Sequence, residues 1–110
     1  REQVPVTLLE AGEVDREWLV IDGRSVEARE SARPRGSMHI PFEFRNRELF
    51  QVPDGAPVQR VVVVMDADEE SQARELALWI AGQWGIERVA TLVGGWPAWQ
   101  AAGLPTEEGP

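Results

Sequence analysis

The chain has 110 residues, 43% of them hydrophobic, which is enough for one compact core and too few for two ordinary domains. Its formal net charge of -8 argues against nucleic acid as a partner, because binding to a phosphate backbone depends on Lys and Arg. With no cysteine, the sequence excludes disulfides, thiolate metal sites and thiol nucleophiles. We therefore expect a single domain over residues 1–110.

No apolar run approaches the roughly 20 residues that span a bilayer, and no secretory leader opens the sequence. We expect no membrane partner and a cytoplasmic location. The use of arginine without any lysine fits a GC-rich genome and a bacterial source. Residue 1 is arginine rather than methionine, which is compatible with a fragment of a longer protein.

The first half of the chain predicts strands at residues 4–9 and 18–22, with a helical turn at 15–18 leading into the second. Residues 25–35 carry five charged side chains and almost nothing apolar, which is typical of a solvated segment. Residues 38–41 predict an edge strand or bridge stopped by Pro41, and residues 45–50 one or two helical turns.

The second half contains the clearest pattern, a run of four valines within residues 60–65 that predicts the central strand. Apolar residues at helical spacing between positions 73 and 84 predict a helix ended by Gly85. A strand at 88–93 and a helix at 96–102, closed by Gly103, complete the chain. Strands that alternate with helices predict the α/β class, with a mostly parallel sheet covered on both faces.

Three segments resemble the rhodanese domain family. They are Leu19-Val-Ile-Asp-Gly-Arg24, Gly36-Ser-Met-His-Ile-Pro41 and the closing Leu92-Val-Gly-Gly-Trp-Pro-Ala-Trp-Gln-Ala-Ala-Gly-Leu-Pro105, of which the last is the most specific. The resemblance implies a five-stranded parallel sheet flanked by helices on both faces. It also places an active loop between the central strand and the helix that follows it.

That loop has the sequence Met65-Asp66-Ala67-Asp68-Glu69-Glu70-Ser71. The resemblance aligns Met65 with the family's cysteine nucleophile, Asp68 or Glu69 with a glycine and Glu70 with an arginine, and only Ser71 is retained. A thioether cannot lose a proton or form a persulfide, so Met65 removes the family's mechanism. Four carboxylates in the loop would also repel thiosulfate or phosphate. We expect a degenerate site with no catalytic residue, no metal and no cofactor.

Three readings of the acidic loop remain open: Asp68 as a helix cap with Glu69 and Glu70 in the first turn, a docking surface for a basic partner, or a calcium or magnesium site. Asp22 and Arg24 are candidate pocket-lining residues. We expect Asp22 to form a structural ion pair or to cap a turn rather than to act as a base. Departures from the family's pattern upstream of the loop argue against assigning a substrate contact to Arg24.

The remaining candidates are mostly structural. We expect His39, the only histidine, to have a structural or surface role, and Trp84 and Trp99 to be core residues. Trp79 and Trp96 fall off the apolar stripes and would be contact anchors if exposed. A cluster of five arginines is predicted to form a solvated face paired with nearby Glu, with an acidic partner or a neighbouring subunit as the alternative; its members are Arg29, Arg33, Arg35, Arg45 and Arg47.

These residues together predict a non-catalytic rhodanese-like domain with a protein-interaction, regulatory or scaffolding role. The expected partner is a protein, with a tandem active rhodanese domain or a second copy of the chain as candidates. The alternative function is an enzyme or cation-binding protein that reuses the pocket with the loop carboxylates. Sulfur transfer is not expected without cysteine.

Overall fold

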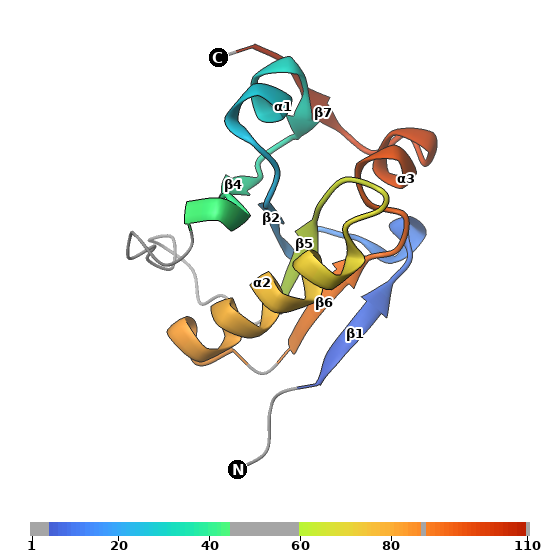
Figure 1. Cartoon of the computed structure of the whole chain (residues 1–110). Coiled ribbons are helices and arrows are strands. Elements are labelled where there is room, and N and C mark those ends of the chain that lie inside the picture. Colours follow the sequence, from blue (N-terminus) through green and yellow to red (C-terminus); the bar gives the residue numbers. More distant parts are fainter. Residues whose placement is uncertain (1–4, 45–59, 87, 110) are drawn as a thin grey trace.

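A computed structural model describes residues 5–44, 60–86 and 88–109. The main sheet has five parallel strands in the order β1-β6-β5-β2-β4, as Figure 1 shows. Its strands are β1 (Val6–Leu9), β2 (Leu19–Asp22), β4 (Met38–His39), β5 (Arg60–Val64) and β6 (Arg88–Leu92). The predicted α/β class and the five-stranded parallel sheet are confirmed.

The central strand is β5, as its valine run predicted. Val61 to Val64 are all completely buried, which suits a strand covered on both faces. Because side chains alternate along a strand, Val61 and Val63 join the core on one side of the sheet, and Val62 and Val64 the core on the other. Two hydrophobic cores therefore lie back to back across the sheet.

Helix α2 (Glu70–Trp84) covers the first of these faces. The five side chains that it buries all belong to the predicted apolar stripe: Ala73, Leu76, Ala77, Ile80 and Ala81. Gly85 ends the helix at a φ of 67°, the left-handed conformation that glycine adopts most easily. The helix and its end residue are as predicted, and its last residue, Trp84, is half-buried against the same core.

The second face is covered by the short helix α3 (Gly95–Ala101) and the 3-10 turn η1 (Ala11–Glu13). Trp99 is 3% exposed, and its indole Nε1 donates to the Pro105 carbonyl at 2.9 Å. A turn does form at the predicted residues 15–18, where the Trp18 N–H donates to the Asp15 carbonyl at 3.2 Å, but it is not part of a helix, and the 3-10 turn η1 lies earlier. The Asp15 carboxylate accepts the Glu17 backbone N–H at 2.9 Å, a local bond that competes with helix formation.

Residues 25–35 are largely exposed, as predicted for a solvated segment, but they contain regular structure that was not predicted. They form α1 (Val26–Ser31) and β3 (Arg33–Pro34), and β3 pairs antiparallel with β7 (Thr106–Glu107) near the C-terminus. Ser25 caps α1 by accepting the Ala28 N–H at 3.2 Å. The helix follows from this cap. Of its charged side chains, Glu27 and Glu30 are exposed, whereas Arg29 is turned toward the buried Asp22.

Two further predictions concern the segment after β2. The edge strand predicted at 38–41 is confirmed as β4, which is followed by the 3-10 turn η2 (Phe42–Phe44). The helical turns predicted at 45–50 lie outside the described residues. Within the described ranges, no helix is long and apolar enough to cross a membrane.

Candidate functional site

The candidate site lies where β2 and β5 end, at the carboxyl edge of the parallel sheet. A cavity of about 430 Å³ opens there between the loop after β5, the start of α1 and η2. Its lining residues are Gly23, Arg24, Ser25, Val26, Glu27, Pro41, Phe42, Glu43, Met65, Asp66, Glu69 and Gln72. This edge is where ligands bind in open α/β sheets.

Met65 forms the floor of this cavity and is only 3% exposed. A methyl group added at Gly23 would lie 2.4 Å from the Met65 sulfur, so that the thioether packs directly against the glycine backbone. The Met65 carbonyl accepts the Trp96 backbone N–H at 2.8 Å, which ties the loop to the start of α3. The sulfur at this position is therefore buried, uncharged and without an acidic proton.

The structure divides the seven loop residues between two sides of α2. Met65, Asp66 and Glu69 line the 430 Å³ cavity, whereas Glu70 and Ser71 line a smaller hollow of about 240 Å³ beside β1. Ala67 and Asp68 are exposed in the turn between them. The expectation that Asp68 caps the helix is wrong, because α2 begins one residue later with Glu69 as its N-cap and without a side-chain cap.

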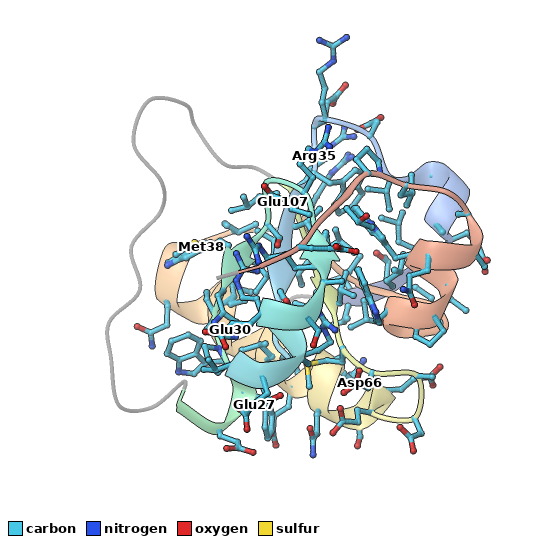
Figure 2. All side chains as sticks on the ribbon, turned by 90° about the horizontal axis from the view of Figure 1, so that it is seen from above. Glu27, Glu30, Arg35, Met38, Asp66 and Glu107 are labelled. Carbon is cyan, nitrogen blue, oxygen red and sulfur yellow. The ribbon has the colours of Figure 1, made fainter. Side chains whose placement is uncertain are left out.

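The cavity is acidic. Its one arginine, Arg24, faces carboxylates from four residues, Glu27, Glu43, Asp66 and Glu69, and Figure 2 shows Glu27 and Asp66 on the same side of the molecule. Within the described ranges, no three His, Asp or Glu side chains lie close enough to hold a metal ion. Sequence reasoning missed Glu27, Glu43 and Gln72, because they come from elements that only the tertiary fold brings to the loop.

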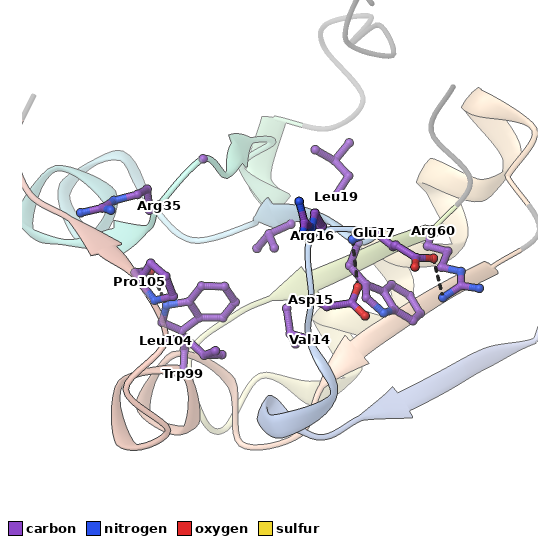
Figure 3. Close-up of a pocket in the computed structure, with 13 residues that line it drawn as sticks. Val14, Asp15, Arg16, Glu17, Leu19, Arg35, Arg60, Trp99, Leu104 and Pro105 are labelled. Carbon is purple, nitrogen blue, oxygen red and sulfur yellow. Dashed lines mark hydrogen bonds and ion pairs between the residues drawn. The ribbon is translucent and has the colours of Figure 1, made fainter. Parts of the chain in front are cut away.

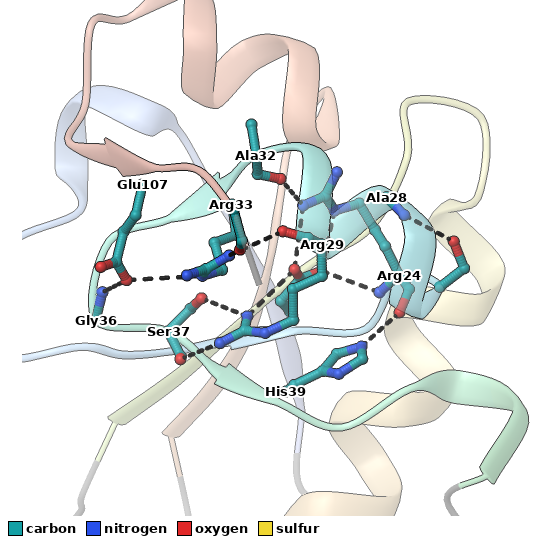
Figure 4. Close-up of polar contacts among 12 residues, drawn as sticks. Arg24, Ala28, Arg29, Ala32, Arg33, Gly36, Ser37, His39 and Glu107 are labelled. Atoms are coloured by element: carbon teal, nitrogen blue, oxygen red, sulfur yellow. Dashed lines mark hydrogen bonds and ion pairs between the residues drawn. The ribbon is translucent and has the colours of Figure 1, made fainter.

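Asp22 is buried and forms an ion cluster with Arg24 and Arg29, both of which are labelled in Figure 4. Its carboxylate receives two bonds from the Arg24 guanidinium, at 3.0 and 3.1 Å, and one from Arg29 at 3.3 Å. The Arg24 backbone N–H also donates to Asp22 Oδ1 at 3.0 Å. Asp22 is completely buried and lines no part of the cavity. The geometry is that of a structural ion pair which also caps a turn, as expected for Asp22.

Arg24 lines the cavity, but its hydrogen-bonding groups are directed elsewhere. Its Nη2 donates to the Ala32 carbonyl at 2.7 Å, and its guanidinium stacks over the Trp96 ring with 4.4 Å to the ring centroid. His39 Nε2 donates to the Arg24 carbonyl at 2.8 Å, which gives His39 the structural role expected of it. These contacts hold Arg24 in place, and the Asp22 carboxylate is the counterion of its guanidinium.

The arginine cluster predicted as a solvated face is partly turned inward. Arg29 donates to the Ser37 hydroxyl at 2.8 Å and to the Ser37 carbonyl at 2.9 Å, in addition to Asp22. Arg33 lies 3.8 Å from the Glu107 carboxylate, and Arg35 is exposed. Arg45 and Arg47 lie outside the described residues. The prediction is wrong for Arg29 because its partner, seven residues earlier, is buried at a strand end.

Among the described carboxyls that line the cavity, Glu69 is the one whose pKa is shifted. Partial burial raises the pKa of this carboxyl from its ordinary 4.5, and the Asp66 carboxylate raises it further by repulsion and by a side-chain hydrogen bond. The more distant Asp68 acts in the same direction, and a hydrogen bond from the Asp66 backbone opposes it. When both carboxyls are ionised, Glu69 and Asp66 therefore repel each other at the cavity wall.

Replacing Glu69 with glutamine is expected to stabilise the domain at pH 7. The raised pKa means that wild-type Glu69 adds stability below pH 4.5 and loses that contribution as the pH rises through the folded-state pKa. The gain should stay below about 1 kcal/mol, since the carboxyl is partly exposed and screened. Thermal unfolding from pH 4 to pH 8 measures it, with Glu43→Gln on the other wall as the control. A gain that is equal in size at every pH would contradict this prediction.

A second hollow lies on the other face of the molecule, between α3 and the segment before β2 (Figure 3). This groove has a volume of about 600 Å³ and includes the apolar residues Val14, Trp18, Trp99 and Leu104. Three arginines accompany two carboxylates in its lining, and one of those arginines, Arg60, pairs with Glu17 at 3.3 Å. The groove is therefore larger, more apolar and less acidic than the cavity at the loop.

The tryptophans are more buried than the sequence pattern indicated. Trp99 is a core residue as predicted, and Trp79 packs half-buried against the core under α2. Trp96 is half-buried beneath Arg24 and packs against the core on the α3 face. Because neither Trp79 nor Trp96 is exposed, the condition for treating them as contact anchors is not met.

Known proteins share this fold. A rhodanese-related protein from Thermoplasma volcanium superposes with a TM-score of 0.71 at 16% identity, over 92% of this chain and 97% of that one. The Alr3790 protein from Anabaena sp. gives a TM-score of 0.69 at 24% identity, over 92% and 80%. A thiosulfate sulfurtransferase from Pseudomonas aeruginosa gives 0.71 at 20% identity, over 98% of this chain and 20% of the larger protein.

None of the curated proteins matches this sequence. The family model of the rhodanese-like domain, however, matches residues 6–102, which include the whole main sheet and all three α-helices. The family, the fold and the position of the loop therefore agree. Since the 110 residues contain no cysteine, the loop lacks the thiol that the family's sulfur transfer requires. The chain belongs to the rhodanese-like domain family.

Proposed function

We propose that this chain is a non-catalytic rhodanese-like domain that acts by binding another protein, in a regulatory or scaffolding role. The observation that carries the proposal is Met65, a buried thioether at the end of the central strand where the family's loop places a thiol. A thioether has no proton to lose and cannot accept a sulfane sulfur as a persulfide. No neighbouring residue supplies a thiol, since the loop's other side chains are carboxylates, an alanine and an exposed serine.

The charge of the cavity supports the same proposal. Thiosulfate and phosphate are anions, and a site that binds them needs cationic groups or free backbone N–H groups. Here the Arg24 guanidinium is bound to Asp22, and the Glu69 backbone N–H donates to the Asp66 carbonyl at 3.1 Å. Four carboxylates surround the remaining space. An anionic substrate would meet repulsion with little to offset it.

The groove on the opposite face favours binding of a protein. Its half-buried apolar residues Val14, Trp18 and Leu104 give the groove an apolar lining, as in the central part of many protein interfaces. The match to one fifth of the Pseudomonas aeruginosa sulfurtransferase shows that this fold also occurs within larger proteins. A catalytic rhodanese domain in tandem is therefore one partner to test, alongside separate proteins from the native source.

Purified protein is expected to show no transfer of sulfur from thiosulfate to cyanide and no hydrolysis of p-nitrophenyl phosphate. The Pseudomonas aeruginosa thiosulfate sulfurtransferase serves as the positive control for the first assay. Wild type and Met65→Ala should give the same background rate in both assays. Turnover that is reproducible and falls in Met65→Ala would show that the position still supports chemistry, and the proposal would then be wrong.

Binding is tested by capture of partners from the native source with wild type and two charge reversals. Arg16 is exposed in the lining of the groove, and Arg88 is exposed at the start of β6, outside it. We expect a partner that wild type and Arg88→Glu capture and that Arg16→Glu loses. Failure of all three proteins to capture any partner would count against a binding role.

The paired carboxyls give a second candidate, namely a cation-binding protein or an enzyme that uses Asp66 and Glu69. The specific observation is the raised pKa of Glu69 in a cavity, which is a common feature of acid–base sites. Titration calorimetry with calcium, magnesium and manganese decides it. A binding heat that disappears in Glu69→Gln and persists in Glu43→Gln would favour this candidate over the non-catalytic domain.

A further inference from the structure

The outer edge of the main sheet at β1 carries the most exposed large hydrophobic side chain of the described residues. Leu8 is 70% exposed, and the next, Val26 on α1, is 46% exposed. Figure 1 shows β1 as the last strand of the sheet, beside β6. A leucine at this position on a sheet edge is unusual, because proteins commonly protect such edges from pairing with other chains.

The usual forms of protection, a proline or a charge, flank β1 at Pro5 and Glu10 but are absent from the strand itself. Its sequence, Val6-Thr7-Leu8-Leu9, contains no charge and no proline, and its pairing with β6 is regular over all four residues. The opposite edge of the sheet is β4, which is only two residues long. Short edge strands offer few groups to a partner, so β1 is the edge that can accept one.

The backbone N–H and C=O groups of Val6 and Leu8 are directed away from β6. The Leu9 carbonyl accepts the Val93 N–H at 3.0 Å, on the side of β6. Because these groups alternate along a strand, those of Thr7 and Leu9 face β6, whereas those of Val6 and Leu8 face outward. An added strand would pair with Val6 and Leu8 and would cover the exposed leucine.

The surface around Leu8 carries a hollow and two opposite charges, so it can match the same surface of a second copy of the chain. Val6 and Leu8 lie beside a hollow of about 240 Å³ whose other lining residues include Glu70 and Arg74, one helical turn apart on α2. A two-fold axis across β1 reverses the direction of the second α2, so that Glu70 of one copy faces Arg74 of the other. The hollow can receive apolar side chains of the second β1.

We propose that two copies of this chain associate through β1, which pairs antiparallel with its counterpart about an axis at Thr7. In this register Val6 of each copy lies opposite Leu8 of the other, and both exchange backbone hydrogen bonds. The two Thr7 residues form the non-hydrogen-bonded pair at the axis, where Cα atoms lie about 4.5 Å apart. The interface uses neither the acidic cavity nor the groove, so it is independent of the proposed function.

Sedimentation velocity from about 10 μM to about 1 mM tests this pairing. Wild type should shift from monomer to dimer with concentration, and Leu8→Lys should weaken association at least about tenfold by placing a charge on the edge. The matched control is Val26→Lys, which changes the other exposed hydrophobic residue and should dimerise like wild type. A wild type that stays monomeric, or a Leu8→Lys variant that dimerises equally well, would overturn the inference.

The lack of native cysteine allows a second test that does not depend on dimer affinity. Thr7→Cys should form a covalent dimer under mild oxidation, because the expected Cα separation lies within the roughly 4.4–6.8 Å range of disulfides. Val26→Cys is the control for random collision. Non-reducing electrophoresis at matched concentrations compares them. Equal crosslinking of the two variants would show that β1 does not lie at a two-fold axis.

Discussion

Asp22→Asn is expected to lower the free energy of unfolding by about 3 kcal/mol or more. Asp22 is completely buried and receives three side-chain bonds from Arg24 and Arg29. The asparagine keeps the shape of the side chain but not its charge. Arg24, which is 4% exposed, would then be a buried cation without a counterion.

The matched control is Asp15→Asn. Asp15 and Asp22 each accept the backbone N–H of the residue two positions later, at 2.9 and 3.0 Å, and asparagine can accept the same bond. Asp15, however, is exposed, so its substitution should change stability by no more than about 0.5 kcal/mol. Urea unfolding compares the two. Equal effects would mean that the turn, and not the ion cluster, stabilises this edge of the sheet.

Gly95→Ala should destabilise the domain by about 2–4 kcal/mol. Gly95 has a φ of 61°, and a Cβ there would lie 2.3 Å from the Met65 carbonyl oxygen. The substitution therefore combines backbone strain with a clash that pushes the loop away from α3. Because Trp96 donates to that same carbonyl, the start of α3 should shift with the loop.

Two other glycines separate these causes. Gly85 has a φ of 67° but open space around it, so Gly85→Ala should show the cost of strain alone, about 1–2 kcal/mol. Gly82 lies in the last turn of α2 with nothing within 4 Å, and Gly82→Ala should stabilise by about 0.5–1 kcal/mol. If Gly95→Ala costs no more than Gly85→Ala, the close approach of Gly95 to the loop does not affect stability.

The sequence predicted an element correctly where its local pattern of apolar residues also reflects which of its side chains the fold buries. The valine run predicted the central strand β5, and the apolar spacing of α2 predicted both the helix and its buried face. Gly94 and Gly95 lie between the strand predicted at 88–93 and the helix predicted at 96–102. The close contact of Gly95 with the Met65 backbone depends on a distance between segments that no single-sequence pattern shows.

The candidate site was less predictable, because its charges are paired across elements. Asp22 ends strand β2 and Arg29 lies in helix α1, so the periodicity of neither element places them together, and only the fold brings Arg29 to the buried carboxylate. Similarly, the loop carboxylates seemed a single cluster in sequence. The start of α2 after Glu69 sends Glu70 toward β1 and leaves Glu69 facing Glu27 and Glu43. A signal for α1 was present in Ser25 followed by acidic Glu27.

The pairing of β1 with β6 has a consequence for synthesis of the protein. Val6 pairs with Val89, so the first strand of the sheet finds its only neighbour among the described residues close to the other end of the chain. During translation, β1 has no place in the sheet until β6 has left the ribosome. A chain that ends before Arg88 would lack β6, and β1 would then have no strand to pair with. The main sheet would lose both strands, and β5, with Val62 and Val63, would become its edge.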